Sequence, residues 1–301
     1  MRVLVTGSSG RLGAVTVNHL RAFGHQVTGI DIIPAGSTDE LIDILNKEAV
    51  LAVTKNIDAI IHTAAIHGKH YELNYPREAF IDVNICGTLN LLNACIANGV
   101  SKLLYTSTTS IYGDAMVDSD KAVWVDEELG IKPRDIYDIT KQTAEQLCKD
   151  FFYHEGLQTS VYRVGRFLPE TDNLKLNHRL YRGLDERDGA EGLRLALDQT
   201  FSAFEIFNIT SSSPFKKEEL VQLKHDPIMV IKKHYPQAGA IYQSKGWEFP
   251  ASIDRVYVSD KAKLYFGYEP KFTFGYLLNN LYDLLSFQNF VSSGSQLGGI
   301  K

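Results

Sequence analysis

The sequence is short of cysteine, has no large excess of charge of either sign, and lacks long apolar runs. Its three cysteines, Cys86, Cys95 and Cys148, are odd in number and form no CxxC motif. This pattern argues against a disulfide framework and is typical of small buried thiols in a reducing compartment, which we expect to lie in helices. A net charge of −5 without a basic stripe argues against nucleic acid as a partner.

Apolar runs that approach membrane-spanning length are missing, as are internal repeats and low-complexity blocks. The chain opens directly on a strand-like run, which we interpret as leaving no room for a signal peptide. We therefore expect a cytoplasmic protein that does not bind membranes. Its 301 residues are enough to bury one large core or two smaller ones.

What the sequence does contain is a dinucleotide-binding pattern at its start. The strand-like run Arg2 to Thr6 is followed at once by Gly7, Gly10 and Gly13, spaced by three residues. Residues without Cβ are needed where backbone meets a pyrophosphate at a helix N-terminus, and where that helix meets the sheet. An apolar helix pattern follows the turn, and Asp31 ends the next strand, as this motif requires.

Asp31 also discriminates between cofactors. Its carboxylate can accept hydrogen bonds from the adenosine ribose but would repel a 2′-phosphate, and no Lys or Arg lies between Ile32 and Ser37 to neutralise one. The sequence therefore predicts NAD rather than NADP. Arg11, inside the glycine turn, leaves an alternative open, because its guanidinium could reach either the pyrophosphate or the ribose.

Strand-like runs alternate with helical patterns along the chain. The expected strands are Arg2 to Thr6, Gln26 to Ile30, a short one at Glu40 to Ile44, Asp58 to His62, Lys102 to Ser107, Thr159 to Arg163 and Glu205 to Ile209. The expected helices run from the glycine turn to about Phe23, then Asp39 to Thr54, Pro76 to Asn98, Asp135 to His154, Ala190 to Leu197 and Tyr276 to Ser286. This order predicts an α/β fold with a Rossmann-type doubly wound parallel sheet.

Beyond Gly165 the alternation weakens, which predicts a smaller C-terminal substrate lobe. We expect residues 1–164 to form the NAD-binding Rossmann domain with the catalytic residues. Residues 165–290 would form the substrate-binding lobe, interleaved with the first domain and closing over the carboxyl edge of the sheet, where ligands of such sheets bind. Residues 291–301, rich in Ser and Gly, are expected to form a flexible tail.

Tyr137 and Lys141 stand four residues apart, and therefore lie one above the other on a helix face. A Tyr with an unperturbed pKa near ~10 is a poor base at neutral pH. A neighbouring ammonium, joined by the positive charge of an oxidised nicotinamide, favours the phenolate. Thr108, at the end of an expected strand, supplies a hydroxyl that could hold a substrate oxygen.

Six separated motifs give the chain a resemblance to a known family. They are the glycine turn, Asp31, the strand ending in Ala64 and Ala65, Asn84 in DVNICGTLNLL, the Thr108 segment, and Tyr137 to Lys141. In this order they resemble an extended short-chain dehydrogenase/reductase of the NAD-dependent epimerase/dehydratase family. The resemblance covers the chain to about Pro169 and returns weakly at 185–197 and 254–270.

The resemblance implies roles for particular residues. Thr108 would stand at the catalytic Ser/Thr position, Tyr137 would be the acid/base, and Lys141 would lower the pKa of Tyr137 and bind the nicotinamide ribose. The cofactor-binding residues would be Gly7, Ser9, Gly10, Arg11, Leu12, Gly13, Asp31, Ala64, Ala65, Asn84, Tyr137 and Lys141. A homodimer through a four-helix bundle is also implied, although the apolar stripes of the helices Arg77 to Asn98 and Gln142 to His154 could equally be core.

Departures from the family pattern narrow the reaction and the substrate. Dehydratases follow the catalytic Thr with Asp-Glu, whereas Thr109 and Ser110 stand here, which disfavours dehydration. The Asn expected after the sixth strand is replaced by Arg166, which weakens the expectation of a sugar nucleotide. We expect His67, Thr109 and Arg166 to face the substrate, and consider Arg179, Arg182 and Arg255 as further sites for an anion.

No metal site is expected. His67 and His70 lie close together in the sequence, but no carboxylate or Cys shares a plausible ligand spacing with them. We interpret this segment as a substrate-facing loop.

The sequence and the resemblance together predict NAD-dependent hydride transfer at a secondary alcohol of a sugar, sugar nucleotide or sugar derivative. We expect epimerisation through a transient keto intermediate. The alternative is a net dehydrogenase or reductase of a sugar or sugar acid. A non-catalytic dinucleotide-binding redox sensor is a third possibility, disfavoured because the set Thr108, Tyr137 and Lys141 is complete.

Overall fold

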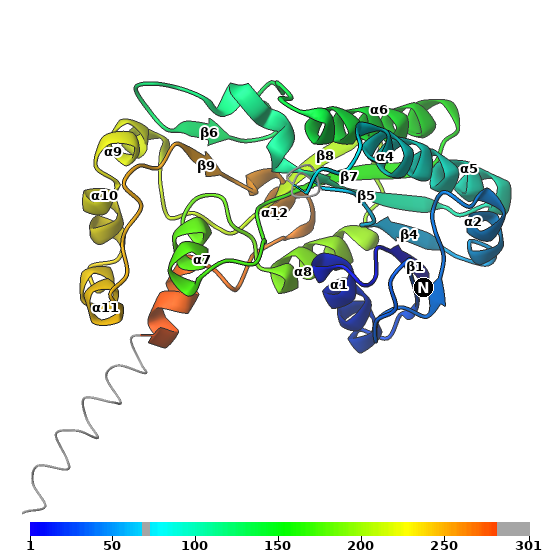
Figure 1. The fold of residues 1–301 in the computed structure, drawn as a ribbon, viewed down its shortest axis with the longest axis horizontal. Coiled ribbons are helices and arrows are strands. Elements are labelled where there is room, and N and C mark those ends of the chain that lie inside the picture. The colour runs from blue at the N-terminus through cyan, green and yellow to red at the C-terminus, as the bar shows by residue number, and fades with distance from the viewer. Residues whose placement is uncertain (68–72, 282–301) are drawn as a thin grey trace, which may run out of the picture.

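A computed structural model describes residues 1–67 and 73–281. Within these residues the chain forms a parallel sheet of seven strands in the order β3-β2-β1-β4-β5-β7-β8, with helices on both faces (Figure 1). The order reverses beside β1, which is the arrangement of a doubly wound Rossmann sheet. The predicted fold class is confirmed.

The strands of this sheet are short and fully parallel. They are β1 (Arg2–Thr6), β2 (Gln26–Asp31), β3 (Glu40–Leu41), β4 (Ala59–His62), β5 (Lys102–Thr108), β7 (Gln158–Val164) and β8 (Glu205–Ile209). Successive side chains enter opposite layers: Val3 and Val5 of β1 belong to one core, and Leu4 to the other. Burial on both faces explains why the strands are continuous apolar runs rather than alternating ones.

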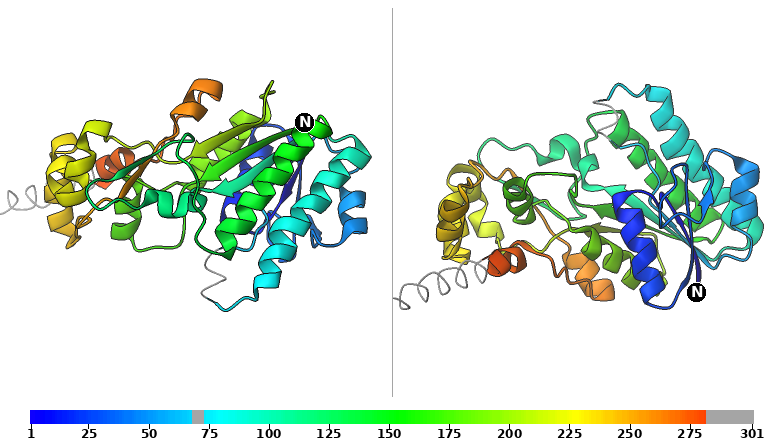
Figure 2. Two further views of the ribbon diagram at one scale, coloured as in Figure 1. Left: turned by 90° about the horizontal axis from the view of Figure 1, so that it is seen from above. Right: turned by 60° about the horizontal axis from the view of Figure 1, so that its bottom comes forward.

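Helices cover both faces of the sheet (Figure 2). One face is covered by α1 (Arg11–Ala22), α8 (Glu186–Leu197) and α12 (Asp260–Phe266), whose apolar residues join Val3 and Val5. The other is covered by α2 (Lys47–Val53), α5 (Thr88–Asn98) and α6 (Ile136–His154), whose apolar residues join Leu4. The short α4 (Arg77–Ile81) and a π-helical segment, η1 (Asp82–Gly87), lead into α5.

A second, smaller lobe lies beside the sheet, at the left of Figure 1. It contains α7 (Asp172–Arg179), η3 (Lys217–Glu219), α9 (Leu220–His225), α10 (Pro227–His234) and α11 (Ala238–Lys245). A separate parallel pair, β6 (Val123–Val125) and β9 (Arg255–Tyr257), joins a segment of the first half of the chain to this lobe. The lobe has its own apolar core, which includes Phe215, Ile241 and Phe274.

Several elements differ from the sequence prediction. The helix expected at Asp39 to Thr54 is wrong in its first half, because residues 40–41 pair with β2 and the helix begins only at Lys47, after the cap Asn46. A 3₁₀ segment, η2 (Thr109–Met116), and β6 were missed, as were α7, α9 to α11 and α12. These elements are short, and short segments carry too few periods for a reliable pattern. Of the helix expected at Tyr276 to Ser286, residues 274–281 are described and helical.

Two expectations about apolar residues need correction. Residues Arg77–Asn98 form one helix that is long and apolar enough to cross a bilayer, contrary to the expectation of no such run. Half of that helical stretch is buried inside the protein, and core helices pass the same test, so this is weak support for a membrane span. Cys95 and Cys148 are buried as expected, but Cys86 is exposed, because it lies on an outward-facing part of η1.

Candidate active site

The glycine turn joins β1 to α1 at the carboxyl edge of the sheet. Gly7 has a φ of +71°, and a Cβ there would lie 2.6 Å from the backbone nitrogen of Ala64. A Cβ on Gly13 would lie 2.1 Å from the carbonyl oxygen of Gly7. Gly7 therefore needs its conformational freedom, and Gly13 allows the first turn of α1 to pack directly on the end of β1.

The N-terminus of α1 is open to an anion. Its cap, Gly10, has no side chain to satisfy the first amides, and the first turn contains no acidic residue. By contrast, α6 and α8 begin with Asp135 and Asp185, whose carboxylates accept hydrogen bonds from their own first-turn amides. Free amides and a positive helix end fit the pyrophosphate of a dinucleotide, and Arg11 and Leu12 supply the first amides of that turn.

Asp31 lies at the end of β2, next to this turn. Its carboxylate accepts hydrogen bonds from the amides of Ser9 (3.0 Å) and Ile33 (3.1 Å). These bonds hold the carboxylate beside the glycine turn, which is where the ribose hydroxyls of a bound dinucleotide would need an acceptor. Arg11 does not contact Asp31 in this arrangement; its Nε donates to Glu186 Oε1 (2.6 Å) at the start of α8.

The segment after β4 forms the next wall of the expected cofactor groove. Ala64 donates its amide to Thr6 Oγ1 (3.2 Å), which ties the segment to β1, and Ala65 follows it. Asn84, in η1, is buried, and its Oδ1 and Nδ2 bond the amide and the carbonyl of Ile66, each at 2.9 Å. Nδ2 also donates to Thr140 Oγ1 on α6 (3.0 Å). Asn84 therefore fixes the backbone of Ile66, next to the expected groove.

Thr108 and Tyr137 meet at the carboxyl end of β5. Thr108 caps η2 by accepting the amide of Ser110 (3.1 Å), and its side chain also hydrogen-bonds to that of Tyr137. Tyr137 comes from the first turn of α6, which begins after the cap Asp135. Burial raises the pKa of Tyr137 to about 12, and the hydrogen bond to Thr108 offsets only part of this rise.

Lys141 lies one turn further along α6 and is buried. Its Nζ donates to the carbonyl of Thr106 (2.7 Å) and lies 4.2 Å from the centre of the Tyr105 ring. Burial lowers the pKa of Lys141 to about 7, against the opposing influence of Glu145. Because the pKa of Lys141 lies near neutral pH, a small change in local charge can change the fraction of Lys141 that is protonated.

The residues expected to face the substrate are spread over several elements. Thr109 is buried, and its hydroxyl donates to the carbonyl of Val164 (3.3 Å) at the end of β7. Arg166 follows β7 and donates to Glu170 (2.5 Å). His67 ends the described part of the loop after β4, and His70 lies outside the described residues.

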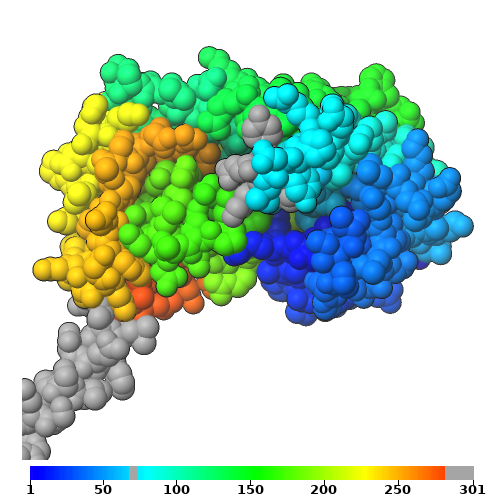
Figure 3. Space-filling model, viewed as in Figure 1, coloured from blue at the N-terminus to red at the C-terminus, as the bar shows by residue number. Residues whose placement is uncertain are grey.

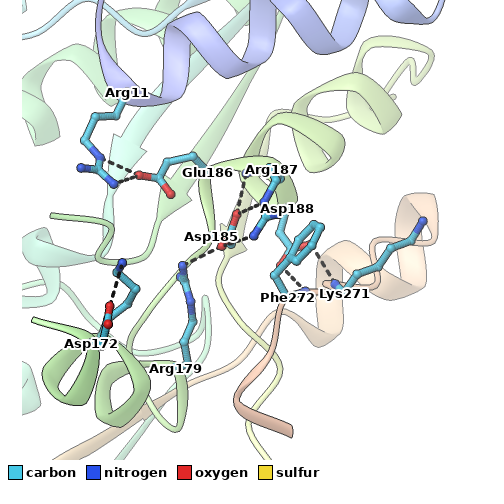
Figure 4. Close-up of polar contacts among 10 residues, drawn as sticks. Arg11, Asp172, Arg179, Asp185, Glu186, Arg187, Asp188, Lys271 and Phe272 are labelled. Carbon is cyan, nitrogen blue, oxygen red and sulfur yellow. Dashed lines mark hydrogen bonds and ion pairs between the residues drawn. The ribbon is translucent and has the colours of Figure 1, made fainter. Parts of the chain in front are cut away.

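A cavity of about 60 Å³ lies between the glycine turn and the second lobe, on the face that is hollowed in Figure 3. Ionisable side chains dominate its lining, namely Arg11, Arg166, Glu170, Lys175, His178, Arg179, Asp185 and Glu186. Figure 4 shows Arg11 paired with Glu186, and Arg179 and Arg187 converging on Asp185. Arg166 and Arg179 are therefore brought to one site, where Arg166 pairs with Glu170 and Arg179 with Asp185.

Sequence reasoning missed Glu170, His178 and Glu186. Glu186 lies far along the chain from Arg11, and no local pattern connects them. His178 is held between Glu170 (2.7 Å) and Arg182 (2.7 Å), a relation that only the folding of α7 over the loop after β7 creates. Within residues 1–67 and 73–281, no three metal-ligating side chains gather into a site.

The fold and this site define a dinucleotide-binding protein of the short-chain dehydrogenase/reductase type. Residues 3–180 match the NAD dependent epimerase/dehydratase family, and the chain belongs to that family, as its motifs predicted. NAD, the predicted cofactor, is the one in the family's description.

Similar proteins include sugar-acid and sugar-nucleotide enzymes. A uronate dehydrogenase of Pseudomonas putida is 28% identical over 181 residues, covering 58% of this chain and 64% of that protein. UDP-glucose 4-epimerase 4 of Oryza sativa subsp. japonica is 30% identical over 190 residues, covering 56% of this chain and 49% of that protein. The chain thus spans less than two thirds of the length of these relatives.

Solved structures of similar fold cover nearly the whole chain. A short-chain dehydrogenase/reductase superfamily protein from Agrobacterium tumefaciens, solved with bound NAD, superposes with a TM-score of 0.71 at 20% identity, covering 98% of this chain and 100% of that one. UDP-N-acetylglucosamine 4-epimerase from Bacillus cereus gives 0.68 at 23% identity, covering 95% and 99%. At these identities, the likeness establishes a shared fold.

Proposed function

We propose that this protein is an enzyme that transfers hydride between NAD and a secondary alcohol of a sugar or sugar derivative. The observation that carries this proposal is the meeting of Thr108 with Tyr137, with Lys141 one turn away, at the same sheet edge as the open N-terminus of α1. A groove that suits a dinucleotide and a group that can exchange a proton therefore share one edge.

Each member of the set has a distinct task. Thr108 holds the reacting hydroxyl next to Tyr137, and Tyr137 Oη accepts the hydroxyl proton. Because burial holds the pKa of Tyr137 near 12, the phenol needs positive charge nearby to act at neutral pH, and the ammonium of Lys141 supplies it. NAD, when bound, supplies the hydride acceptor and donor.

Epimerisation is the reaction we propose first. Thr109 and Ser110 replace the acidic pair of the dehydratases, so elimination lacks its acid and base. The intermediate ketone would then be reduced again on its other face, and Tyr137 would return the proton to the oxygen.

Net oxidation of a sugar acid is the second candidate, and a specific observation favours it. Arg179 is 4% exposed, lines the cavity, and its Nε finds no hydrogen-bond partner among the described residues. A buried guanidinium with an unused donor suits a carboxylate or a hydroxyl of the substrate. The uronate dehydrogenase relative acts on a substrate with such a carboxylate.

The experiment begins with the purified protein and its bound nucleotide. NAD retained through purification and released on denaturation supports epimerase cycling, whereas empty sites with NADH formed from a uronate support net oxidation. Tyr137→Phe should abolish turnover, a loss of about 10²–10⁴-fold, without changing the melting temperature. Tyr265→Phe, at an exposed tyrosine of α12, is the control. Persistent NAD binding without turnover on any sugar or polyol would contradict the proposal and favour the redox sensor.

We also propose a cytoplasmic homodimer formed through α4, α5 and α6. Ile81, Ile96, Ile139 and Tyr153 lie on these helices, and each is more than 40% exposed. Such side chains would be buried by a second copy of the same helices in a four-helix bundle. Ile139→Asp should convert the dimer to monomer in sedimentation analysis, whereas Val221→Asp, at an exposed apolar residue of α9, should not.

A further inference from the structure

Glu145 is a buried carboxylate that the proposed chemistry does not use. It lies on α6 one helical turn beyond Lys141, and its side chain is fully shielded from solvent. Its Oε1 accepts the hydroxyl of Ser107 (2.6 Å) and Arg163 Nε (3.0 Å), and its Oε2 accepts Arg163 Nη2 (2.8 Å). A charge this deeply buried is rare and destabilises the fold unless it is well paired.

The partners of Glu145 belong to the strands that carry the site. Ser107 and Arg163 are opposite one another in the register of β5 and β7, so one carboxylate joins both strands to α6. Ser107 stands between Thr106, whose carbonyl holds Lys141, and Thr108, which bonds to Tyr137. The carboxylate of Glu145 is therefore held at the end of β5, next to the two residues that contact Lys141 and Tyr137.

We propose that Glu145 is a positioning residue that keeps Lys141 charged and Thr108 in place, so that Tyr137 can act as the base. This inference rests on the proposed function. Tyr137 and Lys141 can share one proton as phenol and amine or as phenolate and ammonium, and only the second form is reactive. A negative charge nearer to Lys141 than to Tyr137 favours that form.

The other groups around Lys141 do not supply this charge. From β4, His62 is neutral, because burial lowers its pKa to about 3. From β5, Tyr105 presents its ring and Thr106 its carbonyl. From α6 itself, Cys148 also faces Lys141, but burial raises the pKa of that thiol far above neutrality. Among these neighbours, Glu145 is the carboxylate, and its counter-charge is Arg163 of β7, which it pairs with at 2.8 Å.

The test compares the nearly isosteric Glu145→Gln with the unmutated enzyme. We expect kcat to fall by about 10-fold or more with KM unchanged, because substrate contacts stay and the reactive form is lost. NMR titration of isotope-labelled lysine in the protein without added substrate, with the Lys141 signal assigned through Lys141→Met, should show its pKa lowered by about 1. Glu145→Asp keeps the charge but moves it towards the α6 backbone. It should give an intermediate kcat and an intermediate pKa of Lys141.

Glu219→Gln is the matched control, since Glu219 is a buried carboxylate bonded to Lys233 and His234 in the second lobe. It should lower the melting temperature without changing kcat or the Lys141 titration. A Glu145→Gln protein with a lower melting temperature but unchanged kcat and unchanged Lys141 pKa would overturn the inference. If Glu145→Gln does not fold, an unchanged Lys141 pKa in folded Glu145→Asp would overturn it equally. Activity that survives Tyr137→Phe would instead contradict the proposed function.

Discussion

Asn84 holds Ile66 by two hydrogen bonds of opposite direction, accepting from its amide and donating to its carbonyl, each at 2.9 Å. The amide group of one buried side chain thus replaces the strand partner that the backbone loses where β4 ends. Because the adjoining Ala64 and Ala65 are expected to line the cofactor groove, this pair connects η1 to the shape of that groove.

Asn84→Ala should therefore weaken NAD binding as well as stability. The loss leaves the amide and carbonyl of Ile66 without partners and should reduce the free energy of unfolding by about 1–3 kcal/mol. Isothermal titration with NAD and urea unfolding measure the two effects. Asn90→Ala is the control. Asn90, on α5, also bonds backbone carbonyls, but they are those of Ile44 and Leu45, between β3 and α2, and not that of the segment after β4. Equal NAD affinity in both variants would contradict this role for Asn84.

Gly13→Ala should abolish NAD binding and destabilise the protein. The new methyl would stand 2.1 Å from the carbonyl oxygen of Gly7, so either α1 or the glycine turn must move. Gly130→Ala, at a glycine with open space around it, should leave both properties unchanged. Thermal unfolding with and without NAD would check this, and a Gly13→Ala protein that NAD stabilises normally would show that the turn can relax.

NAD should bind more tightly than NADP, and loss of the charge of Asp31 should narrow the difference. Asp31→Asn removes the repulsion of a 2′-phosphate, but it keeps an acceptor for only one of the two amides, because those of Ser9 and Ile33 bond different carboxylate oxygens. We expect the preference to fall by about 10-fold, or roughly 1.4 kcal/mol; Asp31→Ala should narrow it too. Fluorescence titration with both cofactors measures it. Tighter NADP binding by the unmutated protein would mean that Arg11 leaves Glu186 and dominates the site.

His62 should make the protein acid-sensitive. It is 1% exposed, bonded to Thr6 Oγ1 (2.7 Å) and Thr88 Oγ1 (3.0 Å), and burial lowers its pKa from 6.5 to about 3. As the pH falls through about 6.5, His62 binds a proton in the unfolded chain but not in the folded protein. Stability is therefore fully present above about pH 6.5 and falls as the pH drops towards 3, by on the order of 5 kcal/mol.

Urea unfolding between pH 7 and pH 4 measures this dependence. His62→Asn should lower stability at pH 7 but flatten the decline, whereas His225→Gln, at an exposed histidine, should change neither. An unchanged slope in His62→Asn would show that other groups cause the acid sensitivity.

The features that could be predicted from the sequence are those that depend on residues close together in the chain. The glycine turn, the end of β2 at Asp31 and the four-residue spacing of Tyr137 and Lys141 each arise within one element or one connection. Long periodic elements such as α6 were predicted for the same reason, while the short helices of the second lobe were not.

Tertiary structure alone decided the rest. The pairs Arg11 with Glu186 and β6 with β9 join residues more than a hundred positions apart, and no spacing rule connects such segments. The burial that lowers the pKa of Lys141 and raises that of Tyr137 likewise depends on what packs over α6, not on α6 itself. The sequence shows which groups are present and which are neighbours along a helix or strand. The pKa of each group is set by the whole fold, because desolvation and charge act through space.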